Sequence, residues 1–206
     1  MSLPFKIGVD GGGTKTECIL VDAAGGIVAR HLAPGCNPNV AGPEQARLIL
    51  TDALAALFLA AKSADPAATI SATQLYMAGS RAFWLETAAT LHDFGAVSVA
   101  DDSLPVLELA THGQPGLVLH AGTGSFVAAR GPDGSIHYAG GTGWRFGDPG
   151  SGYDLGRRAI GRALLELQGW SPASRLGPTV RDHTQLGETA DAGAVTRFFY
   201  QHAEPN

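Results

Sequence analysis

The stretch Ile7-Gly8-Val9-Asp10-Gly11-Gly12-Gly13-Thr14-Lys15-Thr16 decides how the chain begins to fold. The apolar run at 5–9 predicts a buried strand that ends at Asp10. The three glycines allow a sharp turn that brings backbone N–H groups close to an anion, and the following threonines and lysine add donors and positive charge. A carboxylate at the end of the strand is placed to hold magnesium, directly or through water. Two interpretations stay open, a phosphate-binding loop with a metal carboxylate and a glycine-rich hairpin turn, because an apolar run resumes at Cys18.

The composition indicates a compact α/β protein and excludes several other classes. The chain has 206 residues, 45% of them hydrophobic, with 28 glycines and a net charge of −5, and without a lysine or arginine run it offers no nucleic-acid surface. Cys18 and Cys36 form no CxxC pair, which argues against a disulfide scaffold or a zinc site. The longest apolar run, 53–61, is too short to span a bilayer, and the first strand leaves no room for a signal peptide, so we expect a cytoplasmic location.

Hydrophobic periodicity predicts alternating strands and helices in the first part of the chain. The predicted strands are 5–9, 17–21, 27–32, 74–78 and 96–100, and the predicted helices are 43–62, 81–94 and 103–111. A loop rich in turn-forming residues at 33–42 separates the third strand from the first helix.

The opening pattern of strand, glycine turn, strand, glycine turn and strand then repeats. The second copy has predicted strands at 117–120, 126–130 and 136–139, with a turn at 121–125 that again combines glycine with hydroxyl residues. We interpret the repeat as two lobes, 1–115 and 116–206, with a ligand between them. Helices are predicted at 151–167 and 191–202, but no apolar run after Gly169 supplies further strands, so the second lobe is expected to be truncated.

Four motifs together resemble one known family. They are the first glycine turn (10–16), Val99-Ala100-Asp101-Asp102-Ser103-Leu104, Ala121-Gly122-Thr123-Gly124-Ser125, and the stretch 147–156, which is similar to "GDEGSGxxLG". Their order and spacing resemble the BadF/BadG/BcrA/BcrD-type ATPases and N-acetylglucosamine kinases, within the acetate-kinase/sugar-kinase/Hsc70/actin superfamily. The resemblance implies an α/β, actin-like ATPase (ribonuclease H-like) fold, and it implies ATP and Mg2+ as cofactors.

The resemblance also implies roles for individual residues. Asp10 would coordinate magnesium, and Asp102 would be the catalytic base. The nucleotide phosphates would be bound by Gly11, Gly12, Gly13, Thr14 and Lys15 from one lobe and by Gly122, Thr123, Gly124 and Ser125 from the other.

The choice of Asp102 over Asp101 has a physical side. A carboxylate at the C-terminal end of a strand faces the crevice of an open α/β sheet, where it can accept the proton of an attacking hydroxyl. Two adjacent residues of a strand point in opposite directions, so only one of them should face the substrate. Asp101 then has an alternative role, as a cap or turn residue before the helix at Ser103.

The resemblance extends to sugar contacts from Asn37, Asp102, Thr123, Gly141 and Asp148. The Asn37 amide can donate and accept at once, as adjacent sugar hydroxyls require, although an Asn before Pro38 is also favoured for turn geometry alone. The chain departs from the family where the sugar is held: Thr142 replaces a frequent tryptophan, the indole stands at Trp144, and Pro149 replaces an acidic residue. Nothing after Gly169 matches the superfamily's adenosine motif.

These observations predict an ATP-dependent kinase of N-acetylglucosamine or glucosamine, transferring phosphate most naturally to O6. One alternative is an ATPase that activates a 2-hydroxyacyl-CoA dehydratase or benzoyl-CoA reductase type enzyme, which would need cysteines for an iron–sulfur cluster. Another is a truncated, non-catalytic sugar-binding protein. The expected partners are small molecules rather than nucleic acid or membrane, and a second copy of the chain is a candidate cover for the second lobe, as a homodimer.

Overall fold

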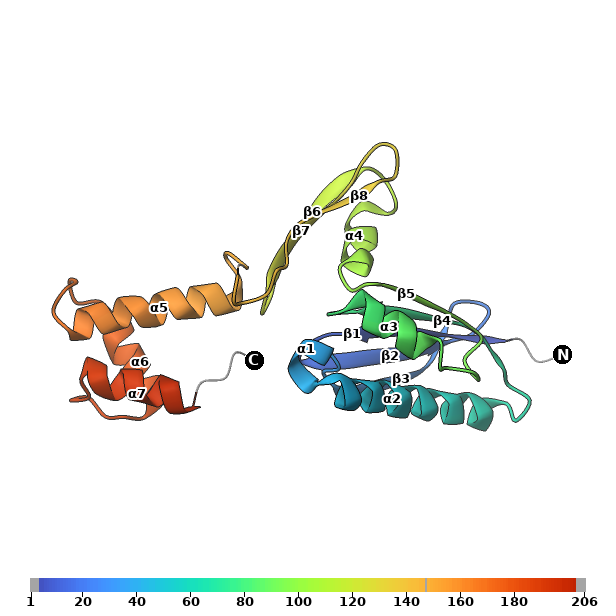
Figure 1. Ribbon diagram of the computed structural model, residues 1–206, viewed down its shortest axis with the longest axis horizontal. Helices are drawn as coiled ribbons and strands as arrows, with labels where there is room; N and C mark the ends of the chain where they lie inside the picture. Colours follow the sequence, from blue (N-terminus) through green and yellow to red (C-terminus); the bar gives the residue numbers. More distant parts are fainter. Residues whose placement is uncertain (1–3, 147, 203–206) are drawn as a thin grey trace. The chain divides into compact units, whose positions relative to one another are not determined.

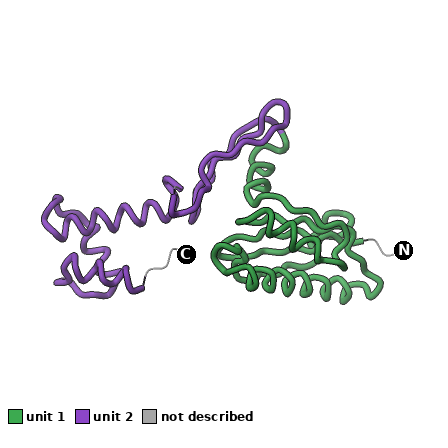
Figure 2. Tube along the Cα trace, viewed as in Figure 1, with its two compact units in different colours: residues 1–113 green, residues 114–206 purple. Residues whose placement is uncertain are grey.

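The computed structural model describes residues 4–146 and 148–202. Its backbone contacts divide the chain into two compact units, residues 1–113 and 114–206 (Figure 2). The lobes predicted at 1–115 and 116–206 lie close to this division. Each unit is described by itself.

Unit 1 is built on a five-stranded mixed sheet with the strand order β3-β2-β1-β4-β5. The strands are β1 (Phe5–Gly11), β2 (Lys15–Val21), β3 (Ile27–Pro34), β4 (Ile70–Met77) and β5 (Ala96–Asp101). The first three strands form antiparallel hairpins, whereas β4 runs parallel to both β1 and β5. The parallel strands β1, β4 and β5 therefore end at the same edge of the sheet.

Four helices complete unit 1: α1 (Pro38–Ala41), α2 (Pro43–Ala64), α3 (Arg81–Ala88) and α4 (Leu104–Thr111). The long helix α2 covers one face of the sheet (Figure 1). Its apolar side chains recur with the period of a helix and form the buried face, since Leu50, Leu54 and Leu57 are almost fully inaccessible and pack with Leu20 and Leu75 of the strands. The 3.6-residue period of the sequence thus created the core of this unit.

The sequence placed two boundaries in unit 1 wrongly. β4 begins at Ile70 rather than at residue 74, because Ile70, Ala72 and Thr73 already pair with β1. The hydroxyl of buried Thr73 also donates to the carbonyl of Phe94. The helix predicted at 81–94 ends at Ala88. The hydroxyl of Thr90 there donates to the carbonyl of Thr87, a local bond that competes with continuing the helix.

Unit 2 contains a three-stranded antiparallel sheet, ordered β6-β7-β8, and three helices. The strands are β6 (Gly116–Ala121), β7 (Ser125–Arg130) and β8 (Ile136–Gly140), and the helices are α5 (Gly152–Leu167), α6 (Leu176–Thr184) and α7 (Ala192–His202). The helices pack together around Ala163, Val180 and Val195. The sequence missed α6, whose buried positions include only one large apolar side chain, Val180.

The sheet of unit 2 leaves large apolar side chains in contact with solvent. Leu117 and Leu119, on one face of β6, are 65% and 69% exposed. In the part of the chain that the structure describes, no helix combines the length and apolar character needed to cross a bilayer.

Candidate functional site

The glycine stretch forms the turn between antiparallel strands β1 and β2, so the hairpin interpretation describes its geometry. The Gly12 N–H donates to the Lys15 carbonyl, which closes the turn. The backbone N–H groups of Gly13 and Thr14 have no hydrogen-bond partner among the described residues. Successive unpaired N–H groups in a turn form a small concave site for an anion, so the hairpin turn also offers what a phosphate needs.

The segment after β3 packs against this turn and is hydrogen-bonded to it through the backbone. The carbonyl of Gly12 accepts hydrogen bonds from the N–H groups of Cys36 and Asn37. A Cβ atom added at Gly35 would lie 2.0 Å from the Gly13 carbonyl oxygen, so only glycine permits this approach. Gly35 was not among the predicted site residues, although a glycine in a segment rich in turn-forming residues can indicate a close backbone approach.

Two of the expected donors are used differently. The hydroxyl of Thr16, which is fully buried, donates to the Pro34 carbonyl at 2.8 Å and is not available to a ligand. The Lys15 ammonium group is exposed and lies 3.4 Å from the Glu17 carboxylate. Thr14 is exposed at the tip of the turn.

The sheet register brings the aspartate pair to the edge where the glycine turn lies. Gly11 of β1 pairs with Met77 of β4, which pairs with Asp101 of β5, so Asp102 follows directly at this edge. Asp101 accepts hydrogen bonds from both the N–H and the hydroxyl of Ser103. This is the turn role proposed for Asp101 as an alternative, and it leaves Asp102 as the carboxylate that accepts no hydrogen bond from Ser103.

Asp102 has the electrostatic properties of a base. Burial, followed by the negative charges of Asp101 and Asp10, raises the pKa of Asp102 to about 6. Burial also raises the pKa of Asp10, although the positive charge of Lys15 opposes this shift. A carboxyl group with a pKa near 6 is ionised at neutral pH, yet it accepts a proton more readily than an ordinary aspartate does.

Asn37 caps the short helix α1. Its side-chain oxygen accepts a hydrogen bond from the N–H of Asn39 at 3.0 Å, and Pro38 occupies the first helical position. Sequence analysis treated this region as a loop, although Asn followed by Pro is a helix-start signal. The amide NH2 group of Asn37 has no partner among the described residues, so it remains able to donate to a ligand.

The second glycine turn, between β6 and β7, repeats the features of the first. The Gly122 N–H donates to the Gly124 carbonyl, and the N–H groups of Thr123 and Gly124 have no partner within the described ranges. The hydroxyl of Ser125 donates to the Pro149 carbonyl at 3.0 Å, so it supports the turn. Residues 148–153 are tied to this turn, since the N–H of Gly152, at the start of α5, donates to the Gly122 carbonyl.

Asp148 lies buried against this turn with one oxygen unsatisfied. The residue is 6% exposed and has a φ of 65°, a left-handed conformation that aspartate tolerates better than most residues. A Cβ atom added at Gly124 would lie 3.0 Å from its Oδ2. Its Oδ1 has no hydrogen-bond partner in the described part of the chain, and such an atom calls for a donor from a ligand.

The predicted site residues fall into two groups. Asp10, the turn 11–15, Asn37 and Asp102 belong to unit 1. Thr123, Gly141, Asp148 and the rest of the second turn belong to unit 2, where the Gly141 N–H donates to the Ser125 carbonyl. Gly147, the first residue of the predicted motif 147–156, lies outside the described residues.

Comparison with known proteins relates nearly the whole chain to sugar kinases. It is 27% identical over 203 residues to the N-acetyl-D-glucosamine kinase of Dictyostelium discoideum, and 26% identical over 194 residues to the N-acetylmuramic acid/N-acetylglucosamine kinase of Clostridium acetobutylicum. These alignments cover 93% and 92% of this chain but only 64% and 63% of the two relatives.

Solved structures give the same result. A protein of Chromobacterium violaceum, provisionally assigned as an N-acetylglucosamine kinase, matches with a TM-score of 0.80 and 32% identity over 100% of this chain and 70% of its own. A Porphyromonas gingivalis protein with the same provisional assignment matches with a TM-score of 0.66 over 98% of this chain and 73% of its own; at 22% identity it supports the fold alone. The predicted α/β, actin-like ATPase fold is confirmed.

The family model of the BadF/BadG/BcrA/BcrD ATPases matches residues 7–198, which span both glycine turns, Asp102, helices α5 and α6, and the larger part of α7. The predicted resemblance is therefore confirmed, and the chain belongs to the BadF/BadG/BcrA/BcrD ATPase family.

Proposed function

We propose that this chain carries the phosphate- and sugar-binding parts of an ATP-dependent amino-sugar kinase, with N-acetylglucosamine or glucosamine as acceptor. The observation that carries the proposal is Asp102, a carboxyl group with a raised pKa at the sheet edge that also holds the first glycine turn. The chain spans about 64% of the length of the curated relatives it matches, so activity, substrate and cofactors are proposed here and not established.

In this proposal Asp102 accepts the proton of the acceptor hydroxyl as that oxygen attacks the γ-phosphorus of ATP, and ADP leaves as the bond between the γ-phosphorus and the β-phosphate oxygen breaks. The proton transfer makes the hydroxyl more nucleophilic, while positioning and charge stabilisation supply the rest of the rate enhancement. The unpaired N–H groups of Gly13 and Thr14, and of Thr123 and Gly124, hold phosphate oxygens.

Asp10 fits a supporting role in binding Mg2+. The described residues contain no group of three or more side chains that would hold a metal ion by themselves. Magnesium in kinases is commonly bound by one or two carboxylates, with phosphate oxygens and water as its other ligands. Asp10, at the end of β1 beside the turn, supplies one such carboxylate, and a magnesium ion would neutralise phosphate charge there.

The sugar contacts proposed for Asn37 and Asp148 have matching chemistry. The free NH2 group of Asn37 donates hydrogen bonds, and the unsatisfied Oδ1 of Asp148 accepts one. A sugar hydroxyl does both, so it has the chemistry to satisfy either side chain.

The activating-ATPase alternative is less well supported. Cys18 and Cys36 are both fully buried in unit 1. Burial raises the pKa of Cys18 to about 12 and also raises the pKa of Cys36, so both thiols stay protonated at neutral pH, whereas cluster iron binds thiolates.

The test is the pair Asp102→Asn and Asp101→Asn, assayed for ADP release with and without N-acetylglucosamine. Asp102→Asn should lower sugar-dependent turnover by about 10²- to 10⁴-fold and leave sugar affinity within a few fold, because the amide keeps the shape but takes up no proton. Asp101→Asn is the matched control and should retain most turnover.

Three outcomes count against the proposal. If Asp101→Asn lost turnover and Asp102→Asn retained it, the assignment of Asp102 as the base would be wrong. ADP release from the parent chain that ignores every amino sugar would favour the activating ATPase, and no release at all with intact sugar binding would favour a non-catalytic binding protein.

A further inference from the structure

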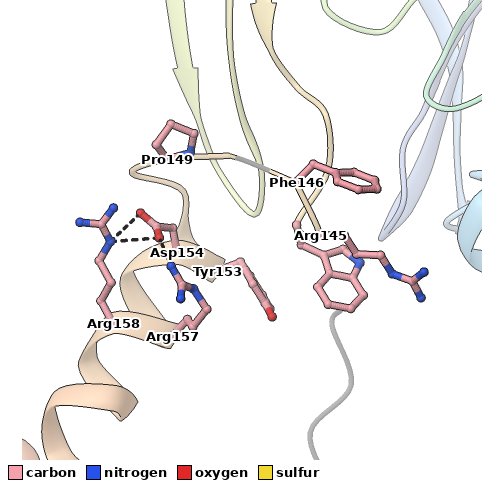
Figure 3. A pocket seen from close by; sticks show the side chains of 8 residues that line it. Arg145, Phe146, Pro149, Tyr153, Asp154, Arg157 and Arg158 are labelled. Atoms are coloured by element: carbon pink, nitrogen blue, oxygen red, sulfur yellow. Dashed lines mark hydrogen bonds and ion pairs between the residues drawn. The ribbon is translucent and has the colours of Figure 1, made fainter.

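A cavity in unit 2 lies beside the residues proposed to bind sugar but contains none of them. Its volume is about 890 Å³, and its walls are formed by residues 144–146, Pro149 and the first turns of α5 (Figure 3). Pro149 directly follows Asp148, and its carbonyl accepts the Ser125 hydroxyl of the second glycine turn. The cavity is therefore continuous along the chain with Asp148 and the second glycine turn.

The cavity has an excess of positive charge. Arg157 and Arg158 both bind the carboxylate of Asp154, at 3.2 and 3.0 Å, and the Gly150 N–H adds a further hydrogen bond at 3.0 Å. That N–H, together with the two arginines, lowers the pKa of Asp154 to about 2. One carboxylate thus neutralises one of two guanidinium groups, each of which keeps unused donors and is about two-thirds exposed.

A third arginine on the opposite wall adds a charge without a counterion. The guanidinium of Arg145 lies 5.1 Å from the centre of the Trp144 ring, and it makes no ion pair within residues 4–146 and 148–202. The three arginines and Asp154 give the cavity a net charge of about +2, counting each guanidinium as +1 and the carboxylate as −1. Arginine guanidinium groups bind carboxylates and phosphates through paired N–H donors.

Aromatic rings supply the rest of the lining. Tyr153 points from the start of α5 toward the loop that carries Arg145 and Phe146 (Figure 3). The rings of Trp144 and Tyr153 are 5.6 Å apart and tilted by 57°, so they contact each other and leave no parallel slot for a nucleobase between them. Their outer faces and edges suit the C–H groups of a sugar ring better than a planar base.

We infer that this cavity binds the anionic group of an acidic amino sugar, and that Arg145 and Arg157 select for that group. The inference rests on the proposed kinase function and names a substrate class for it. The shared chemistry is an oxyanion on an amino sugar, either a carboxylate on the acceptor or a phosphate on a phosphorylated sugar.

The test measures the affinity of the 206-residue chain for three sugars by calorimetry at low salt. They are N-acetylglucosamine, N-acetylmuramic acid as the carboxylate and N-acetylglucosamine 6-phosphate as the phosphate. At least one anionic sugar should bind about tenfold more tightly than the neutral one, which is the effect of one charge-assisted hydrogen bond at a partly exposed site. Added salt should weaken that preference and leave the affinity for the neutral sugar unchanged.

Three single variants complete the experiment. Arg145→Gln and Arg157→Gln should each remove most of the preference for the anionic sugar and keep binding of N-acetylglucosamine. Arg197→Gln, an exposed arginine on α7 outside the cavity, makes the same charge change and should alter neither affinity. The carboxylate and phosphate arms then show which kind of anionic sugar is selected.

The outcomes separate this inference from the proposed function. If N-acetylglucosamine binds but neither anionic sugar binds more tightly, or if Arg145→Gln and Arg157→Gln leave the preference intact, the inference is overturned and the kinase proposal stands. Failure of all three sugars to bind would overturn both. Loss of nucleotide binding in the arginine variants, with unchanged sugar affinities, would assign the cavity to the nucleotide and also overturn the inference.

Discussion

The two glycine hairpins share a sequence pattern and a hydrogen-bond pattern but differ sharply in what covers them. In the β1–β2 hairpin, Ile7 and Val9 are 2% and 1% exposed. In the β6–β7 hairpin, the equivalent positions two and four residues before Ala121, Leu119 and Leu117, are 69% and 65% exposed. Both turns are nevertheless closed by a glycine N–H, which donates to the carbonyl three residues later in the first turn and two residues later in the second, and each leaves two N–H groups without a partner among the described residues.

This difference separates local from tertiary causes. The turn geometry depends on glycines and on short-range backbone bonds, so it forms in both units. Burial depends on an apolar helix packed on the sheet, which α2 provides in unit 1. The helices of unit 2 instead share a small core of their own.

The largest contrast should come from the same truncation in the two hairpins. Leu20→Ala in β2 removes a fully buried side chain and should lower the free energy of unfolding of unit 1 by about 2–5 kcal/mol. Leu119→Ala removes an exposed one and should change stability by less than about 0.5 kcal/mol. Urea unfolding checks this, and the fluorescence of buried Trp84 reports on unit 1 once Trp144 and Trp170 of unit 2 are replaced by phenylalanine. An equal cost for both variants would mean that the face of β6 is covered in solution.

A smaller effect should distinguish how the two turns are supported. Gly35→Ala places a methyl group against the backbone of Gly13 and should cost about 1–3 kcal/mol and weaken phosphate binding, because the turn must move. Gly124→Ala meets only the side chain of Asp148, which can shift, and should cost less. Gly13→Ala, with open space around its added Cβ, is the control for stability. Thermal unfolding and calorimetry with inorganic phosphate measure both properties, and equal costs at Gly35 and Gly13 would contradict the close approach.

The smallest effect is a pH dependence of opposite sign in the two units. The pKa of Asp102 is raised from 3.8 to about 6, so unit 1 should gain stability as the pH falls from about 6 toward 4, where the folded state takes up the proton first. The pKa of Asp154 is lowered to about 2, so its stabilising contribution in unit 2 is complete above pH 4 and is lost between about pH 4 and 2. Asp102→Asn should remove the pH dependence of stability only between about pH 6 and 4, and Asp154→Asn should remove it only between about pH 4 and 2. Denaturation at a series of pH values measures both. A variant that flattened the other range would show that the assignments are wrong.

Sequence reasoning predicted all eight strands and most of the helices, because each carries a local signal. The stripe of α2 and the repeated strand–turn–strand pattern follow directly from hydrophobic periodicity. The start of β4 at Ile70 was missed because it depends on pairing with β1, which no local pattern encodes. Helix α6 was missed because it buries mainly small or polar positions, Gly177 and Thr184 beside Val180.

The candidate site shows the same limit. The motifs placed Asp102, both turns and Asp148 at strand ends or loops, where the structure has them. They did not reveal that Ser103 donates hydrogen bonds to Asp101, or that the Thr16 and Ser125 hydroxyls donate to backbone carbonyls of the chain itself. Nor did they reveal that Asp148 is buried with an unsatisfied oxygen. These facts depend on which atoms meet in three dimensions, and single-sequence spacing does not contain that information.

The cap made by Asn37 has a consequence for molecular recognition. An amide side chain is normally ambiguous, since either end can be turned toward a ligand. Here the bond from the Asn39 N–H fixes the oxygen on the helix and leaves only hydrogen-bond donors outward. A ligand hydroxyl that binds Asn37 therefore acts only as a hydrogen-bond acceptor there. Replacing that hydroxyl by fluorine, which accepts weakly and donates nothing, should be tolerated there better than at Asp148, where the ligand must supply the hydrogen. Fluorinated sugars would in this way identify the hydroxyl that binds Asn37 and the hydroxyl that binds Asp148.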